Sequence, residues 1–505
     1  MLIGIDLGTS SFKAIAVDDD GVVVAKSTAT YPLINLRSGW SEQDPAEWWR
    51  ATGEAMTELA AKLPEKGKEI TAIGLCGQMH GLTAIDADGE VIRPAILWND
   101  QRCAAECDWI TEQVGGIDRL VELVGNRMFP GYTGGKIIWL RDHEPENYAK
   151  MVRLLNPKDY IRFRMTGLYV TDVSDASGTG LFDVRNRTWS LEALDAIGVD
   201  PALLPDVVES IEQTGTLDNE VAAAWGFPAD TPVFGGGGDA VIQTTAMGLV
   251  EEGSAGFTVG TAGIVAGGLS RYPENPGGKV QVSCGNAPGH WHIMGNANSA
   301  GGAFQWLRDS LTPLDETEKL SFETLIGLAR KVEPGANGVL FLPYLLGERA
   351  PNLAPDASAA FVGLTQMHDI SHMSRALLEG VLMNMREILD ICISAGLQSD
   401  QVIASGGVTN ESLWLQMLAD ILGREVVTQV GASEGGAYGA VLAAGVGSGV
   451  WPDLTSALTQ VKVEKTYQPD AAAHAKYQTV FGAHRKLHAA MADVYELART
   501  AEGAA

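Results

Sequence analysis

The sequence predicts an α/β protein built from two similar halves. Strand-like and helix-like patterns alternate along both halves, which is typical of helices that cover mixed sheets. The 505 residues exceed the size at which one hydrophobic core keeps growing, so at least two domains are expected. Two strand–Gly-Thr–strand hairpins, residues 2–17 and 253–268, lie roughly half a chain apart and indicate a duplication. We place the two domains at residues 1–247 and 248–505.

The composition excludes several classes of partner. With 36 basic and 63 acidic residues the formal charge is −27, which disfavours nucleic acid and anionic membranes. The five cysteines are odd in number; Cys103 and Cys107 could share a metal, but no second Cys/His pair accompanies them, so reduced thiols are favoured. No apolar run is long enough for a membrane span and no basic signal region opens the chain, so we expect a soluble cytoplasmic protein. The oligomeric state stays open, with a homodimer as one option.

The first hairpin carries the most informative residue, Asp6. It lies in an alternating apolar strand, where a charge needs a partner or a metal. Thr9 and Ser10 follow in a turn whose hydroxyls and backbone N–H groups suit a phosphate. The hairpin therefore indicates Mg²⁺–nucleotide chemistry. The alternative, that Asp6 only braces the turn, fits this hairpin alone equally well.

The remaining elements follow from periodicity and caps. Asp44 is a predicted N-cap and Pro45 the first residue of a helix that reaches about residue 63. Further segments are expected as follows: strands at 22–29, 70–76, 232–239 and 402–404; a hairpin of 82–85 with 91–97; helices within 102–164 and at 300–311, 370–395, 411–422, 433–444 and 471–501; a loop at 174–183.

Two further strand ends carry glycines. One holds Gly260 and Thr261; the other holds Gly406, Gly407 and Asn410. Ligands of α/β proteins bind at the carboxyl ends of strands, where backbone N–H groups point outward. Neither end fits the P-loop or the G-x-G-x-x-G pattern, and each alone could be a structural turn. Together with the first hairpin, they favour a nucleotide site split between segments.

A second group suits a hydroxylated ligand. Asp239 ends a run of four glycines, where a carboxylate can accept a hydroxyl proton, although it could instead cap the next helix. Gln78, Met79 and His80 end a strand and are flanked by glycines, a polar–apolar–polar triplet that suits a sugar. His80 alone could equally be a hydrogen-bonded core histidine.

The chain resembles the FGGY family of carbohydrate kinases, and within it the xylulokinases. The matching stretches run in the expected order along nearly the whole chain: 4–10 (Gly-Ile-Asp-Leu-Gly-Thr-Ser), 40–45, 77–81 (Gly-Gln-Met-His-Gly), 96–100, 155–160, 174–179, 236–239 (Gly-Gly-Gly-Asp), 342–344 and 347–349. Residues 77–81 are the most specific to xylulokinases.

The resemblance implies an actin-like fold of two ribonuclease-H-like domains with the active site in the cleft between them. It implies phosphorylation of a ketopentose by ATP and Mg²⁺, with D-xylulose as first choice. By the same resemblance Asp239 is the catalytic base and Asp6 lies near Mg²⁺. Sugar contacts would come from Met79 and His80. Phosphate contacts would come from Thr9, Ser10, Gly260 and Thr261, and adenosine contacts from Gly406, Gly407 and Asn410.

One departure weakens the choice of sugar. Xylulokinases commonly carry Asn after the catalytic aspartate, whereas this chain has Ala240. The missing amide removes a hydrogen-bond partner worth about 1 kcal/mol. Ribulose, another ketose or a polyol therefore stays an alternative substrate. A non-enzymatic actin-like ATPase and a sugar-binding regulator are the alternatives from other classes.

Overall fold

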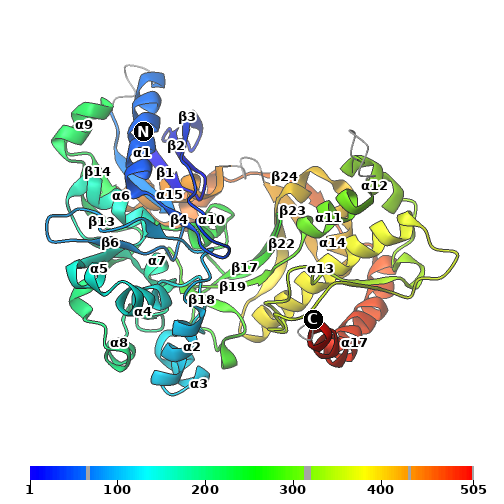
Figure 1. Ribbon diagram of the computed structural model, residues 1–505. Helices are drawn as coiled ribbons and strands as arrows, with labels where there is room; N and C mark the ends of the chain where they lie inside the picture. The colour runs from blue at the N-terminus through cyan, green and yellow to red at the C-terminus, as the bar shows by residue number, and fades with distance from the viewer. Residues whose placement is uncertain (64–68, 312–319, 430–433, 503–505) are drawn as a thin grey trace. The chain divides into compact units, whose positions relative to one another are not determined.

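The computed structural model describes residues 1–63, 69–311, 320–429 and 434–502. They divide into two compact units, each an assembly of helices on a mixed sheet (Figure 1). The first unit comprises Met1–Glu251, Gly268–His292 and Ser433–Val461, and the second comprises Glu252–Gly267, Ile293–Ala432 and Lys462–Ala505. The predicted α/β class is confirmed; a boundary between residues 247 and 248 stays a prediction.

The first unit holds the greater number of short elements. Its strands are β1 Leu2–Leu7, β2 Ser11–Val17, β3 Val23–Thr30, β4 Glu42–Gln43, β5 Ala72–Gly77, β6 Thr83–Ile85, β7 Ala95–Ile96, β8 Arg153–Leu155, β9 Val170–Asp172, β10 Phe182–Asp183, β11 Thr188–Trp189, β12 Asp206–Val208, β13 Gln213–Thr216, β14 Pro232–Phe234, β15 Gly237–Gly238 and β18 Gln281–Cys284. Its helices are α1 Pro45–Lys62, α2 Ala104–Gln113, α3 Ile117–Val124, α4 Thr133–His143, α5 Pro145–Lys150, α6 Pro157–Thr166, α7 Val173–Ser177, α8 Leu191–Ile197, α9 Asn219–Trp225, α10 Asp239–Ala246, α15 Gly435–Gly447 and α16 Leu454–Ala457, with 3₁₀ turns at Pro201–Leu203, Pro276–Gly278 and Leu458–Gln460.

The second unit contains longer helices. Its strands are β16 Gly253–Val259, β17 Gly263–Leu269, β19 Trp291–Ala297, β20 Leu340–Leu342, β21 Ala360–Val362, β22 Ser399–Gly406, β23 Glu425–Gln429 and β24 Val463–Tyr467, the ends of β17 and β19 reaching into the first unit. Its helices are α11 Gly301–Leu311, α12 Phe322–Ala329, α13 Ile370–Ser394, α14 Ser412–Leu422 and α17 Ala471–Glu502, with 3₁₀ turns at Ala336–Gly338 and Gly407–Asn410.

Strand β1 is buried between two helices from opposite ends of the chain. Ile3, Ile5 and Leu7 belong to one apolar cluster with α1. On the other face Leu2 packs with α15, and a Cβ on Gly4 would lie 2.0 Å from the carbonyl oxygen of Ala437 in that helix. Alternation along the strand therefore gives α1 one face and α15 the other. Figure 1 shows α15, drawn in orange, beside the blue N-terminal strands.

The two sheets share one topology. In the first, β1 pairs antiparallel with β2 and parallel with β5, β5 pairs parallel with β14, and β14 pairs antiparallel with β13. In the second, β16 pairs in the same senses with β17 and β22, β22 with β23, and β23 with β24. The duplication predicted from the two Gly-Thr hairpins is therefore real at the level of strand order and direction.

Local signals predicted most elements correctly. Asp44 caps α1 by accepting a hydrogen bond from the backbone N–H of Ala46 (2.9 Å). The loop predicted at 174–183 is wrong for residues 174–177, because Asp172 accepts the N–H of Ser174 and starts the buried helix α7, and for residues 182–183, which form β10. The predicted hairpin of 82–85 with 91–97 is reduced to isolated bridges, since β6 pairs with β8 and β7 with β4.

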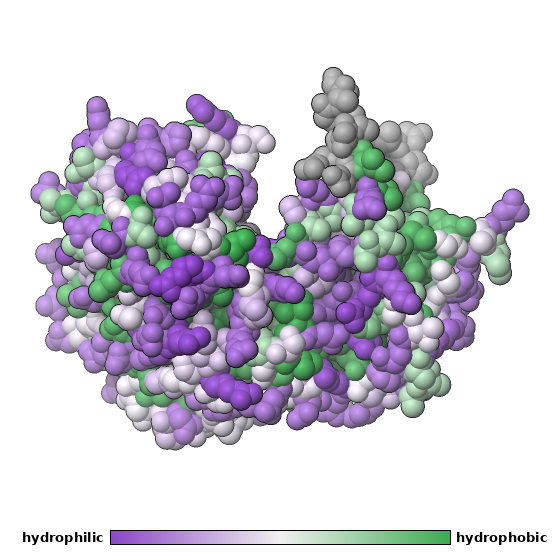
Figure 2. All heavy atoms as spheres, turned by 90° about the horizontal axis from the view of Figure 1, so that it is seen from below, coloured by the Kyte–Doolittle hydropathy of each residue, from purple (hydrophilic) through white to green (hydrophobic). Residues whose placement is uncertain are grey.

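Hydrophilic side chains, drawn in purple, are spread over both units on the face seen in Figure 2. Within the described ranges, the structure contains no helix long and apolar enough to cross a membrane.

Candidate active site

Three adjacent strand ends of the first unit bring the predicted chemical residues together. β5 runs parallel with both β1 and β15, and in register Asp6 lies opposite Cys76 while Gly238 lies opposite Gly77. Asp6 is near the end of β1, residues 78–80 follow β5, and Asp239 follows β15. Carboxyl ends of parallel strands are where α/β proteins bind ligands. The structure therefore brings Asp6, residues 78–80 and Asp239 together at one edge of one sheet, an arrangement that sequence analysis did not predict.

The glycines before Asp239 allow this close approach. A Cβ on Gly238 would lie 2.5 Å from Cγ of Met79. Gly236 has φ +67°, and its Cβ would lie 1.8 Å from the carbonyl oxygen of Leu75. Any side chain at these positions would push the segment away from β5.

Asp239 is the first residue of α10, with Gly238 as N-cap. Its Oδ1 accepts the N–H of Ala240 (2.7 Å), and the N–H of Met79 also binds its carboxylate. Burial, with a further contribution from the charge of Asp6, raises the pKa of Asp239 to about 7 against these donors. Asp239 is therefore not the N-cap that the capping alternative supposed; it is the first helical residue, and its carboxylate accepts the N–H of the residue that follows it. Its pKa is also near the optimum for a general base.

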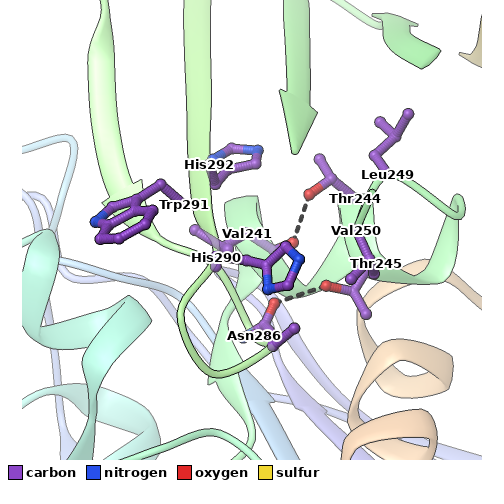
Figure 3. A pocket seen from close by; sticks show the side chains of 11 residues that line it. Val241, Thr244, Thr245, Leu249, Val250, Asn286, His290, Trp291 and His292 are labelled. Atoms are coloured by element: carbon purple, nitrogen blue, oxygen red, sulfur yellow. Dashed lines mark hydrogen bonds between the residues drawn. The ribbon is translucent and has the colours of Figure 1, made fainter. Parts of the chain in front are cut away.

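A hydrogen-bonded network fixes the chain on both sides of Asp239. Ser174 Oγ accepts the N–H of Gly238 (3.1 Å) and a bond from Asn286 Nδ2 (3.3 Å). Asn286 Oδ1 in turn accepts from Thr245 Oγ1 of α10 (2.8 Å), the lower dashed contact in Figure 3. The strand before Asp239 and the helix after it are therefore tied to one amide. Precise placement of this kind is what a reactive carboxylate needs.

The small pocket of Figure 3 lies beside α10 but cannot hold a sugar. It is lined by Val241, Thr244 and Thr245 of α10 and by the segment around His290. Its free volume is about 10 Å³, the space of one water molecule. Nearby, burial lowers the pKa of His292 to about 4, so its ring is neutral near pH 7. This pocket is part of the packing that supports α10.

Asp6 is partly exposed and has few protein partners to neutralise it. Its Oδ1 accepts a weak bond from the thiol of Cys76 (3.3 Å). Burial raises its pKa, opposed by Cys76 and by the charge of Lys13. A Cβ on Gly436 would lie 2.9 Å from Oδ2, so the glycine lets the positive N-terminal end of α15 approach the carboxylate.

This environment fits one specific mode of metal binding. Within the described residues, no group of three or more His, Cys, Asp or Glu side chains could hold a metal ion. Mg²⁺ commonly keeps several waters and binds through one or two carboxylates plus substrate phosphates. A single carboxylate such as Asp6 fits this mode of Mg²⁺ binding.

Residues 78–80 form a fixed surface at the end of β5. Gln78 Nε2 donates to Gln43 Oε1 (3.0 Å), and Met79 is buried. Gln78 Oε1 is buried without a hydrogen-bond partner among the described residues. His80 has φ +69°, its Nδ1 lies 2.6 Å from the carbonyl oxygen of Gly178, and its side chain is half-buried. The histidine is thus hydrogen-bonded, as the core alternative held, yet partly open to a ligand.

Thr9 and Ser10 occupy the turn after β1. The Thr9 hydroxyl accepts from Trp98 Nε1 (3.0 Å), and its carbonyl oxygen accepts from Gln43 Nε2 (2.6 Å). A hydroxyl that accepts from Trp98 can still donate its own hydrogen to a phosphate. Trp98 and Gln43 lie in the stretches that resemble the family, but sequence analysis assigned them no role.

The second unit gathers the other predicted binding residues around a cavity of about 360 Å³. Gly260, Thr261, Gly407 and Asn410 line it. Gly406, which precedes Gly407 in the chain and is not among the residues that line the cavity, has φ +83°, and its Cβ would lie 2.5 Å from the carbonyl oxygen of Val259. The size falls within the range of small-molecule sites.

Aromatic side chains form the wall that sequence reasoning missed. Phe304 and Phe322 stack at 5.6 Å between ring centroids and 22° between planes, and Trp414 meets Phe304 edge-on. Gly301 and Gly302, which open α11, donate their N–H groups to the carbonyl oxygens of Gly260 (2.8 Å) and Thr261 (3.0 Å). A flat heterocycle suits such a wall. No local signal in the sequence indicated this wall, because Phe304, Phe322 and Trp414 come from three separate helices.

Comparison with known proteins places this geometry in a family. The N-terminal domain of the FGGY family of carbohydrate kinases matches residues 1–248, and its C-terminal domain matches residues 257–448. The chain is 38% identical over 488 residues to xylulose kinase of Escherichia coli, covering 97% of this chain and 98% of that protein. It is 31% identical to gluconokinase of Bacillus subtilis, covering 84% and 83%.

Solved structures of related kinases have the same fold as this chain. A xylulose kinase from Brucella ovis superposes with a TM-score of 0.92 at 32% identity, covering 97% of this chain and 99% of that one. The actin-like, two-domain kinase fold that the resemblance implied is therefore confirmed. The chain belongs to the FGGY family of carbohydrate kinases.

Proposed function

We propose that this chain transfers the γ-phosphate of ATP to a ketopentose, D-xylulose first, giving D-xylulose 5-phosphate. The observation that carries the proposal is the pairing, at adjacent strand ends, of Asp239 with the segment 78–80. The similarity to xylulose kinases over nearly the whole chain supports the choice of sugar.

The proposed roles follow the two groups of residues. In the first unit, Asp239 is the general base, Asp6 holds Mg²⁺, and the remaining residues bind the sugar or the phosphates: Gln78, Met79 and His80 the sugar, Thr9 and Ser10 the phosphates. In the second unit, Gly260 and Thr261 contact the phosphates, and Gly406, Gly407 and Asn410 flank the adenosine.

Asp239 removes the proton of the attacking hydroxyl. Because its pKa is about 7, a large fraction is ionised at neutral pH, and the group is still basic enough to accept the proton. Phosphoryl transfer needs positioning and charge neutralisation more than covalent chemistry. When bound, Mg²⁺ neutralises charge on the phosphates. Asp6 would hold it there.

A second substrate class has specific support. Ala240 stands where xylulokinases commonly have Asn, so the sugar loses one hydrogen-bond partner. Ribulose, another ketose or a polyol is therefore the second candidate, and the likeness to a gluconokinase adds a sugar acid. An actin-like ATPase without a sugar substrate has less support, since it would not need residues 78–80 or a base at Asp239.

Sugar-dependent ADP release tests the proposal. The purified chain would be assayed with Mg²⁺-ATP against D-xylulose, D-ribulose, gluconate and glycerol. We expect the highest kcat/KM with D-xylulose. A higher kcat/KM for another sugar would identify that sugar as the preferred substrate. An ATPase rate that no sugar alters would contradict the kinase assignment.

A further inference from the structure

Lys136, in the first turn of α4, is fully buried and binds only neutral groups through the contacts that the structure shows. Its ammonium donates to the carbonyl oxygens of His80 (2.8 Å), Tyr132 (3.3 Å) and Gly131. Carbonyl oxygens stabilise a cation less than a carboxylate does. Burial lowers the pKa of Lys136 to about 8, while the charges of Cys103, Asp100 and Cys107 oppose this shift and that of Arg102 adds to it.

The carbonyl of His80 is the focus of these contacts. Thr133 Oγ1, one helical turn before Lys136, donates to the same oxygen (3.1 Å). His80 has φ +69°, a left-handed conformation that is unfavourable for a residue with a side chain. Two donors on its carbonyl therefore hold a peptide that would otherwise relax.

The same ammonium also fixes the partner of the His80 ring. The rings of His80 and Tyr132 lie 4.8 Å apart, and the Tyr132 carbonyl binds Lys136. His80 Nδ1 lies 2.6 Å from the carbonyl oxygen of Gly178. The ammonium of Lys136 thus binds the backbone carbonyls of the two residues, His80 and Tyr132, whose rings lie side by side.

We infer that Lys136 is a positioning residue for the sugar: it holds His80 in its left-handed conformation, with Tyr132 beside it, at the proposed sugar site. The inference rests on the proposed function. A lysine that only filled space would be replaced at a gain in stability by an apolar side chain of the same length, because a buried cation is costly. A lysine that positions His80 is needed for sugar affinity whatever its effect on stability.

Lys136→Met and Thr133→Val test this, with Lys62→Met, at an exposed position in the last turn of α1, as the control. In the ADP-release assay we expect KM for the sugar to rise about 10-fold in Lys136→Met and two- to threefold in Thr133→Val. KM for ATP and kcat should stay within about twofold, and Lys62→Met should match the parent. A merely structural role would change stability and lower the active fraction without this split.

The outcomes separate the two claims. An active parent with unchanged sugar KM in Lys136→Met overturns the inference alone. A parent inactive on every sugar overturns the proposed function and the inference with it. Should Lys136→Met fail to fold, Thr133→Val carries the test, because it removes only one of the two donors to His80, and an unchanged sugar KM then overturns the inference.

Discussion

The two units share one strand topology, but the residues at their strand ends differ in chemistry. At the strand ends of the first unit lie carboxylates with raised pKa values, a buried lysine and a left-handed histidine. The corresponding ends of the second unit carry exposed glycines beside an aromatic wall. Because the sheets match, the difference comes from the side chains after the strands. We therefore propose that the first unit supplies reactivity and sugar selection and that the second binds the nucleotide.

The largest effect should come from Asp239→Asn. The amide keeps the shape but cannot accept the proton, so we expect kcat to fall about 10²–10⁴-fold. The variant should also be more stable at pH 8. Since burial raises the pKa from 3.8 to about 7, ionisation costs stability above pH 4, and increasingly up to pH 7.

Turnover and thermal stability of Asp239→Asn must both be measured, because they test separate parts of this prediction. Turnover within threefold of the parent would remove Asp239 as the base. Thermal unfolding at pH 8 and pH 4 checks the second part: the gain in Tm should be present at pH 8 and shrink towards pH 4. An equal gain at both would mean that the charge is not its cause.

Asp6→Asn should act on the metal. A neutral amide is a poorer ligand for Mg²⁺ than a carboxylate, so the Mg²⁺ concentration for half-maximal activity should rise about 10-fold. Titration of ADP release with MgCl₂ after EDTA treatment measures this, with exposed Asp20→Asn as the control. An unchanged Mg²⁺ requirement would leave Asp6 with only a bracing role in its turn.

Phe322→Ala should have the smallest effect of the three variants, and it should change only KM for ATP. Phe322 is 41% exposed at the cavity and stacks on Phe304, a contact worth about 0.5–1.5 kcal/mol. We expect KM for ATP to rise about 2- to 10-fold while KM for the sugar stays constant. Leu364→Ala, at an exposed position outside the cavity lining, is the matched control. A change of similar size in KM for the sugar would contradict the proposal that the first unit binds the sugar and the second unit the nucleotide.

What could be predicted from the sequence was local. The Gly-Thr hairpins, the cap of α1 and the glycine-bearing strand ends depend on a few neighbouring residues, and the structure has them. Helix α7 was missed because its small polar residues look like a loop until Asp172 caps it. Lys136 and the Phe304–Phe322 wall could not be predicted, because each depends on partners that only the fold brings near.

Lys158 is the clearest example of a residue whose surroundings could not be predicted from the sequence. It lies in a stretch that contributed to the family resemblance, but nothing local reveals its surroundings. In the structure its buried ammonium lies 3.0 Å from Asp172 and 3.3 Å from Asp175, and it also contacts Asp159. Charges that are neutralised only by tertiary contacts leave no periodic signal in the sequence.

The pH dependence of kcat/KM for the sugar is the sharpest test of whether reactivity lies in the first unit with Asp239 as base. We expect a rise of about tenfold per pH unit on the acid side and a plateau above an apparent pKa near 7, the pKa of Asp239 in the structure. Phe322→Ala should show the same profile at a similar level. A parent profile that stays flat from pH 5.5 to 8.5, or one that Phe322→Ala displaces, would rule out Asp239 as the base or the separation of the two sites.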